Sequence, residues 1–170
     1  MVQLFSIVCF SQQKDSLVIY KEVDDMTGEI YYYTSRDLTI IDPSSKRAFV
    51  LFPFIDNDLI VRGLSCKRSK IGAECSDKDE LIIMFTDSSK LSFTSKSKYN
   101  CDGKSLFLIE YVNNEREHLS SMKIKKIRFA NGKDYTELTR EMPKKDEDYF
   151  IQLFYAIDNN KIKLSPPKKK

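Results

Sequence analysis

Residues 81–95 read LIIMFTDSSKLSFTS, and this stretch decides the fold class. Two strand-like runs, Leu81–Thr86 and Lys90–Ser95, flank the short polar segment Asp87-Ser88-Ser89. Apolar runs of this length around a short segment of turn-forming residues are typical of a β-hairpin. The centre of the chain is therefore expected to be antiparallel sheet.

A second hairpin is predicted further along, where Ile124–Phe129 and Lys133–Leu138 flank Asn131-Gly132. Asn-Gly readily supplies the two positive-φ residues of a type I′ turn. Six more short runs have strand composition and are separated by turn residues: Ser16–Tyr20, Ile30–Ser35, Leu38–Ile41, Arg47–Phe54, Leu59–Leu64 and Ser105–Tyr111. The polar segment Ser65–Asp79 is expected to be a long loop.

The end of the chain changes from strand periodicity to helix periodicity. Phe150, Leu153, Phe154 and Ile157 recur at helical spacing, which predicts one amphipathic helix over roughly Lys145–Asp158. A short helix is also expected within Asn113–Met122, with Asn114 capping its first turn. Many short strands followed by a terminal helix predict an α+β domain, mainly antiparallel β-sheet as a meander or half-barrel, with the helix packed on it.

The length of 170 residues fits one domain, which we place at 12–163, followed by a disordered basic tail at 164–170. The net charge is +3, and the last three residues, Lys168 to Lys170, supply as much. This near-neutral balance argues against a nucleic acid partner, because phosphates usually require a basic face.

The first residues, 1–11, have the form of a signal-peptide remnant. The apolar run LFSIVCF at 4–10 ends at the small residue Ser11, after which cleavage is expected. A run of this length is too short to span a membrane. Export predicts a periplasmic or secreted protein. The alternative is that LFSIVCF forms the first strand of a cytoplasmic domain, since no Lys or Arg precedes it.

The cysteine pattern agrees weakly with export. Removal of residues 1–11 leaves Cys66, Cys75 and Cys101. Cys75 and Cys101 lie on opposite sides of the 81–95 hairpin, so we expect them to form a disulfide. The alternative is that all three are reduced and act as small hydrophobic residues. No CxxC pair is present to indicate a zinc or redox site.

Candidates for catalysis are few in this sequence. His118 is the single histidine and is expected to lie exposed on a helix surface. The acidic residues Glu74, Asp77, Asp79 and Glu80 lack the glycine and distal Glu of a calcium loop, so we expect a solvated charged loop. No GxGxxG, Walker A, HExxH or GxSxG pattern occurs, and no metal or cofactor is predicted. A pair of carboxylates that meets only in space stays open.

Two clusters are candidates for contacts with a partner. The basic run Lys123, Lys125, Lys126 and Arg128 can face an anion or a partner, although solubilising residues on an edge strand explain it equally well. The triplet Tyr31, Tyr32 and Tyr33 can present ring faces to a glycan or a protein, but tyrosine is also a common strand former.

Four pieces of the sequence carry a family resemblance: CSDKDELIIMFTDSSKLSF (Cys75–Phe93), YNCDGKSLF (Tyr99–Phe107), IKKIRFANGKDY (Ile124–Tyr135) and EDYFIQLFYAI (Glu147–Ile157). Together they make Ile71–Asn159 resemble small exported proteins of uncharacterised function from Gram-negative bacteria. The resemblance implies export and two recurring cysteines, Cys75 and Cys101, but no activity. The Asp-Ser-Ser turn at 87–89 departs from the Asp-Gly or Asn-Gly turn of that pattern.

These observations predict a non-enzymatic exported domain that binds an unknown protein or ligand of the cell envelope. One alternative is a hydrolase-type enzyme whose carboxylates converge only in space. Another is a cytosolic inhibitor or immunity-type interaction protein. A pocket with two close carboxylates of perturbed pKa favours the enzyme, whereas a flat apolar or aromatic patch favours the interaction protein.

Overall fold

A computed structural model describes residues 16–72, 76–96, 104–110 and 114–166 of the chain. The expected signal remnant at 1–11, Cys75, Cys101 and residues 167–170 of the expected tail lie outside the described residues. The described elements, in chain order, are β1 (Ile19–Val23), β2 (Ile30–Thr34), β3 (Leu38–Asp42), β4 (Arg47–Ile55), β5 (Val61–Ser69), β6 (Glu80–Phe85), β7 (Lys90–Thr94), β8 (Lys104–Leu108), α1 (Glu115–Ser121), β9 (Ile124–Ala130), β10 (Glu137–Glu141), α2 (Tyr149–Asp158) and β11 (Ile162–Leu164).

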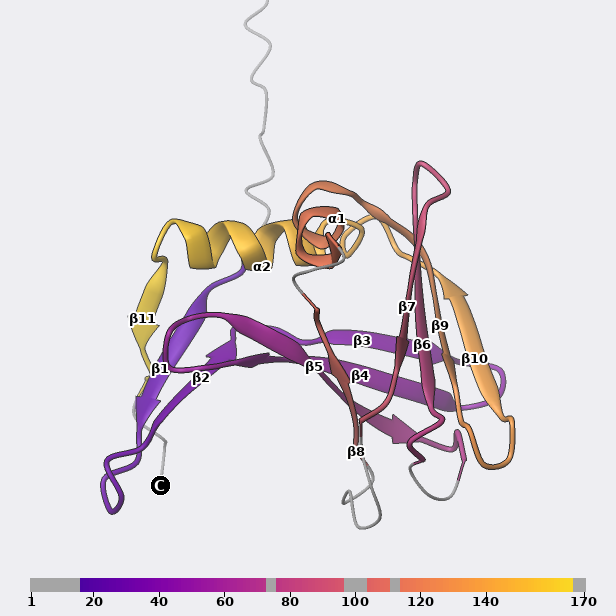
Figure 1. The fold of residues 1–170 in the computed structure, drawn as a ribbon, viewed down its shortest axis with the longest axis horizontal. Coiled ribbons are helices and arrows are strands. Elements are labelled where there is room, and N and C mark those ends of the chain that lie inside the picture. The colour runs from indigo at the N-terminus through magenta and orange to yellow at the C-terminus, as the bar shows by residue number, and fades with distance from the viewer. Residues whose placement is uncertain (1–15, 73–75, 97–103, 111–113, 167–170) are drawn as a thin grey trace, which may run out of the picture.

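The strands form one three-stranded and two four-stranded sheets within the described part of the chain. The four-stranded sheets have the orders β3-β4-β5-β8 and β10-β9-β6-β7, and every pairing in them is antiparallel. β3 lies next to β10, and β7 lies next to β8, so the two sheets meet along both edges. Figure 1 shows the strands of one sheet running across those of the other. The predicted α+β class dominated by antiparallel sheet is confirmed.

The core fills the space between these sheets because alternate strand residues point inward. On β6, Leu81, Ile83 and Phe85 are fully buried, as the hairpin pattern predicts. The ring of Phe129 on β9 lies 5.8 Å from that of Phe49 and 6.2 Å from that of Phe107 on the opposite sheet. The two sheets are therefore joined through a cluster of aromatic rings.

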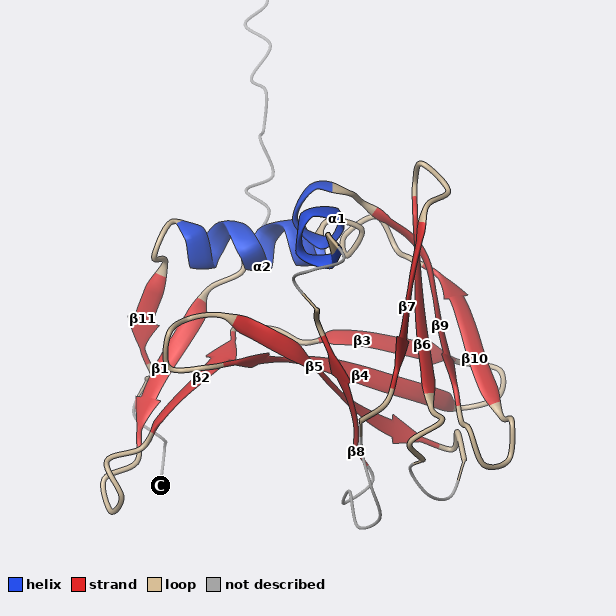
Figure 2. Cartoon of the chain, viewed as in Figure 1, coloured by secondary structure: helices blue, strands red, loops and turns tan. Residues whose placement is uncertain are grey.

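Both helices, α1 and α2, lie on the same side of the molecule, above β3, β4 and β5 (Figure 2). The terminal helix is confirmed, with Tyr149, Phe150, Leu153 and Phe154 buried against the sheets. α2 begins at Tyr149 and not near Lys145, because residues 144–148 form turns. Its apolar face covers the core at the end where the sheets alone do not close it.

The third sheet has the order β11-β1-β2 and contains the parallel pair β1–β11. Ile19 is paired with Ile162, so the chain end returns to the first described strand. Leu164, which we placed in the disordered tail, ends β11. The backbone N–H of Ser165 also donates to the carbonyl oxygen of Lys21.

Three local predictions are wrong. Residues 65–69, expected in a loop, continue β5 and pair with β4, and residues 65–67 also pair with β8. Asn131 and Gly132 form no type I′ turn, because the positive φ in this connection belongs to Tyr135, at 59°. Asn131 Oδ1 instead accepts the backbone N–H groups of Lys133 and Asp134, which stabilises a longer loop. The Asn114 side chain makes no capping hydrogen bond to α1.

Candidate functional site

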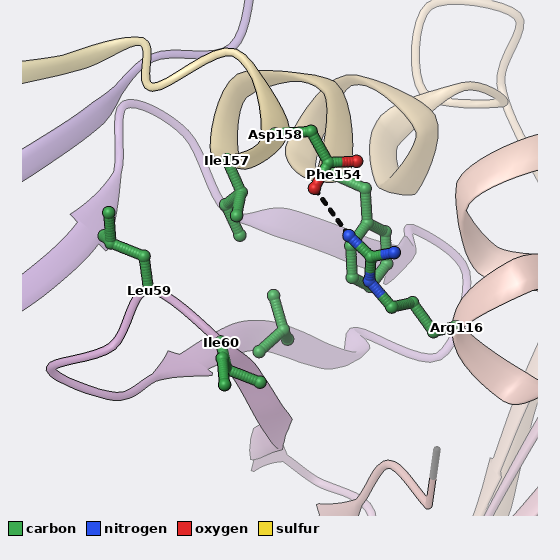
Figure 3. A pocket seen from close by; sticks show the side chains of 7 residues that line it. Leu59, Ile60, Arg116, Phe154, Ile157 and Asp158 are labelled. Atoms are coloured by element: carbon green, nitrogen blue, oxygen red, sulfur yellow. Dashed lines mark hydrogen bonds and ion pairs between the residues drawn. The ribbon is translucent and has the colours of Figure 1, made fainter. Parts of the chain in front are cut away.

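A pocket of about 350 Å³ lies beside the C-terminal half of α2; we call it the α2 pocket. Its walls are mainly apolar, and Figure 3 shows Leu59 and Ile60 on one side and Ile157 and Phe154 on the other. Val61, Arg116 and Asp158 complete the lining. A concavity of this size with few polar groups has the general form of a small-ligand site.

The turn between β4 and β5 positions two of these side chains. Asp56 Oδ1 accepts the backbone N–H groups of Asp58 and Ile60, and Asp56 Oδ2 lies 2.5 Å from Arg62 Nε. Desolvation acts to raise the pKa of Asp56, but the hydrogen bonds from Ile60 and Arg62 outweigh it and lower the pKa. Leu59 takes a φ of 61°, which is uncommon for a bulky residue and turns the chain back on itself. The carboxylate therefore fixes Leu59 and Ile60 at the wall of the pocket.

Arg116 and Asp158 form the polar part of the pocket. Arg116 Nη2 lies 2.5 Å from Asp158 Oδ1, and the guanidinium carbon lies 5.3 Å from the centre of the Phe154 ring. The two side chains are 40% and 51% exposed, so the pair contributes at most about 1 kcal/mol. A bound polar group can therefore replace one of its members at little cost.

The basic run Lys123, Lys125, Lys126 and Arg128 has acidic partners at two of its four residues. β9 lies between β6 and β10, so the expectation of an edge strand is wrong. Arg128 is paired with Glu80 at 2.7 Å and with Glu137 at 3.5 Å, while Lys126 lies 4.0 Å from Glu141. Lys123 and Lys125 are exposed. Acidic side chains of the neighbouring strands thus neutralise the part of the run that points outward from the sheet.

The tyrosine triplet is split between two faces of β2. Tyr31 and Tyr33 point outward and are 50% and 38% exposed, whereas Tyr32 packs against the core. The Tyr33 hydroxyl lies 2.5 Å from Ser165 Oγ, and its ring lies 5.4 Å from that of Tyr20. Two of the three rings are therefore accessible on this face. Their contact with a partner stays a prediction.

A buried polar network that sequence reasoning missed is centred on Asp79. This carboxylate is fully buried, so the expected solvated loop is wrong at this position, whereas Asp77 is exposed as expected. Asp79 Oδ2 accepts from Arg68 Nη1 at 3.2 Å and Ser105 Oγ at 2.5 Å. Asp79 Oδ1 accepts from Asn131 Nδ2 at 3.0 Å and the Gly132 N–H at 2.8 Å. The network joins two strands to two loops and has a structural role.

The remaining candidates form no further cluster within the described residues. His118 is half-buried, not exposed, and its ring lies 6.1 Å from that of Phe85. The described side chains contain no group of three or more His, Cys, Asp or Glu arranged to hold a metal ion. Within the same part of the chain, none of the helices has the length and apolar character needed to cross a bilayer.

Cys66 on β5 is a free, fully buried thiol. Burial raises its pKa above the ordinary value of 9.0, with the nearby Asp79 adding to the effect and Arg68 opposing it. The expected Cys75–Cys101 bridge lies outside the described residues and stays a prediction.

We expect Cys66 to resist alkylation until the protein unfolds. Iodoacetamide should label the tryptic peptide 63–67 more slowly in native buffer than in urea, by a factor on the order of 10³ or more. Because the folded-state pKa is raised, the stabilisation is complete below pH 9.0 and falls as the pH rises above it. Cys66→Val should flatten this alkaline fall. Rapid native labelling measured by mass spectrometry would contradict the burial of this thiol.

The chain was compared with family models, with curated proteins and with solved structures, and none of the three comparisons gave a match. The resemblance to small exported proteins therefore stays a prediction.

Proposed function

We propose that this protein is a non-enzymatic binding domain that takes up a small amphipathic molecule in the α2 pocket. The observation that carries the proposal is the composition of the pocket, in which five apolar side chains adjoin a single Arg116–Asp158 pair. The apolar part of a ligand would displace water from the partly exposed side chains of Leu59, Ile60 and Ile157, which is the main source of favourable free energy. Its polar head would bind the exposed pair.

The polar groups of the pocket support binding over catalysis. Arg116 stacks on Phe154 and is paired with Asp158, so the charges of the pocket satisfy each other. The pocket also presents one carboxylate, whereas glycoside hydrolysis needs two carboxyl groups at a defined separation. An amphipathic ligand fits these groups better than a reacting sugar does.

The setting that we propose is the cell envelope. It rests on the signal-like residues 4–11 and the resemblance of residues 71–159 to exported proteins. The intact mass of the chain from its native host reports where it begins. A mature chain that starts at Gln12 supports export, and a chain that retains Val2 contradicts it and favours the cytosolic alternative.

The binding proposal is tested with the apolar fluorescent probe N-phenyl-1-naphthylamine. The wild-type protein should enhance and blue-shift its emission. Ile157→Lys, which places a charge among the apolar walls, should weaken binding by about tenfold or more. Ile41→Lys is the matched control, because Ile41 is 55% exposed on β3 and does not line the pocket.

Both variants are first shown by circular dichroism to fold and to melt near the wild-type temperature. Enhancement that is lost in Ile157→Lys and kept in Ile41→Lys supports the proposal. Two outcomes would overturn it: no enhancement with the wild-type protein, or equal loss in both variants.

A further inference from the structure

A second concavity lies on the outer face of the β10-β9-β6-β7 sheet, away from the α2 pocket. Its volume is about 390 Å³, and we call it the Tyr135 hollow. Its floor follows from the strand register, because Thr94, Glu80, Ala130 and Glu137 are paired in one row across the four strands. Ala130 is the smallest side chain of this row, so a gap is left between the two glutamates.

The charges around the gap balance. Arg128, two residues before Ala130 on the same strand, is paired with both Glu80 and Glu137, and its side chain is 37% exposed. Lys78 lies at the rim, where it is exposed. Two positive groups thus face two negative ones. An anionic ligand would meet two carboxylates and a cationic ligand would meet two basic groups, so the site favours a neutral polar molecule.

The rim also holds an exposed aromatic ring in a strained position. Tyr135 is 84% exposed, and its φ of 59° is an outlier for a bulky residue. Glycine or asparagine is the usual residue at a left-handed position in such a loop. Tyr135 therefore occupies a backbone position that glycine would occupy without strain. Strained residues of this kind gather at ligand-binding sites.

We propose that the Tyr135 hollow binds a neutral saccharide. Each sugar hydroxyl both donates and accepts hydrogen bonds, so it can donate to Glu80 and Glu137 and accept from Arg128 and Lys78. The flat C–H face of the sugar ring packs on the Tyr135 ring. Thr94 supplies one more hydroxyl partner from β7. This site is separate from the α2 pocket and does not depend on the function proposed for that pocket.

The proposal is tested by saturation-transfer NMR with three neutral probes, cellotetraose, maltotetraose and chitotetraose, and with the anionic probe trigalacturonate. We expect a signal from at least one neutral probe and none from trigalacturonate. Tyr135→Gly should weaken the binding roughly tenfold or more, because it removes the ring. Tyr135→Phe keeps the ring and should retain binding.

Two further measurements separate the role of the ring from a structural role. Tyr135→Gly relieves the strained φ, so it should raise the thermal midpoint while it weakens saccharide binding. Lys46→Gly relieves a similar φ of 56° in the turn between β3 and β4, outside the hollow, and should leave saccharide binding unchanged. Naphthylamine fluorescence should be unaffected by either variant.

Three results would overturn the proposal: no signal from any neutral probe with the wild-type protein, equal signals with Tyr135→Gly, or a signal confined to trigalacturonate.

Discussion

Replacement of Asp79 by alanine is expected to destabilise the fold by about 3–5 kcal/mol, because it breaks a buried ion pair from one side. The Arg68 side chain is only 4% exposed, so its charge would stay buried without its carboxylate. Two groups held by Asp79, Ser105 Oγ and the Asn131 amide, are buried as well. Each hydrogen bond lost at such a buried group costs about 0.5–1.5 kcal/mol.

The measurement is the free energy of unfolding from urea titration of the wild-type and variant proteins. Asp77→Ala is the matched control, since Asp77 is exposed two residues away, and it should change the free energy by less than about 0.5 kcal/mol. A variant that replaces both partners, Asp79→Leu with Arg68→Met, should lose less than Asp79→Ala alone. A loss below about 1 kcal/mol for Asp79→Ala would show that the network is dispensable.

Asp79 shows why part of this structure was out of reach of sequence reasoning. In the sequence it stands among charged residues that look equally solvated, and only the fold brings Arg68, Ser105 and Asn131 around it. The second half of β5 was missed for the same reason, because its environment depends on residues that are distant in the sequence. Most of its residues 65–69 are polar, yet Cys66 in this segment is fully buried. The Arg68 side chain is nearly buried as well, because Asp79 neutralises its guanidinium.

The elements that were predictable are those with a local signal. The β6–β7 hairpin follows from two apolar runs around a short polar turn, and α2 follows from the helical spacing of its aromatic residues. β11 has no such signal, because its partner β1 lies at the other end of the chain. Pairing across that separation depends on the closure of the whole domain.

The candidate sites show the same division. Arg128 was singled out from the sequence as a basic residue, but its acidic partners Glu80 and Glu137 come from two other strands. From the sequence the run was a candidate for contact with an anion or a partner, and the structure places two acidic partners beside Arg128. The residues of the α2 pocket could not be recognised as a binding site from the sequence. Apolar residues such as Ile60 and Ile157 have the same pattern whether they line a pocket or fill the core.

Replacement of Phe129 by alanine is expected to cost about 3–5 kcal/mol. Phe129 is fully buried where the two four-stranded sheets meet, with the rings of Phe49 and Phe107 at 5.8 and 6.2 Å. Truncation leaves a cavity between the two sheets. The sheets cannot approach each other to fill it, because β3 contacts β10 along one edge and β7 contacts β8 along the other. Phe54→Ala is the matched control on β4; its ring is 50% exposed, so it should cost less than about 1.5 kcal/mol.

The two large effects should also be coupled. The Arg68 guanidinium carbon lies 5.8 Å from the centre of the Phe129 ring, and Arg68 is the ion-pair partner of Asp79. Once Asp79 is removed, the Arg68 guanidinium is no longer held over the Phe129 ring, so Phe129→Ala then removes a cation–π contact that is already weakened. The double variant should therefore lose less than the sum of the single losses, by about 0.5–3 kcal/mol. Strict additivity in urea titration would mean that the aromatic cluster and the polar network stabilise the domain independently, and that Arg68 does not link them.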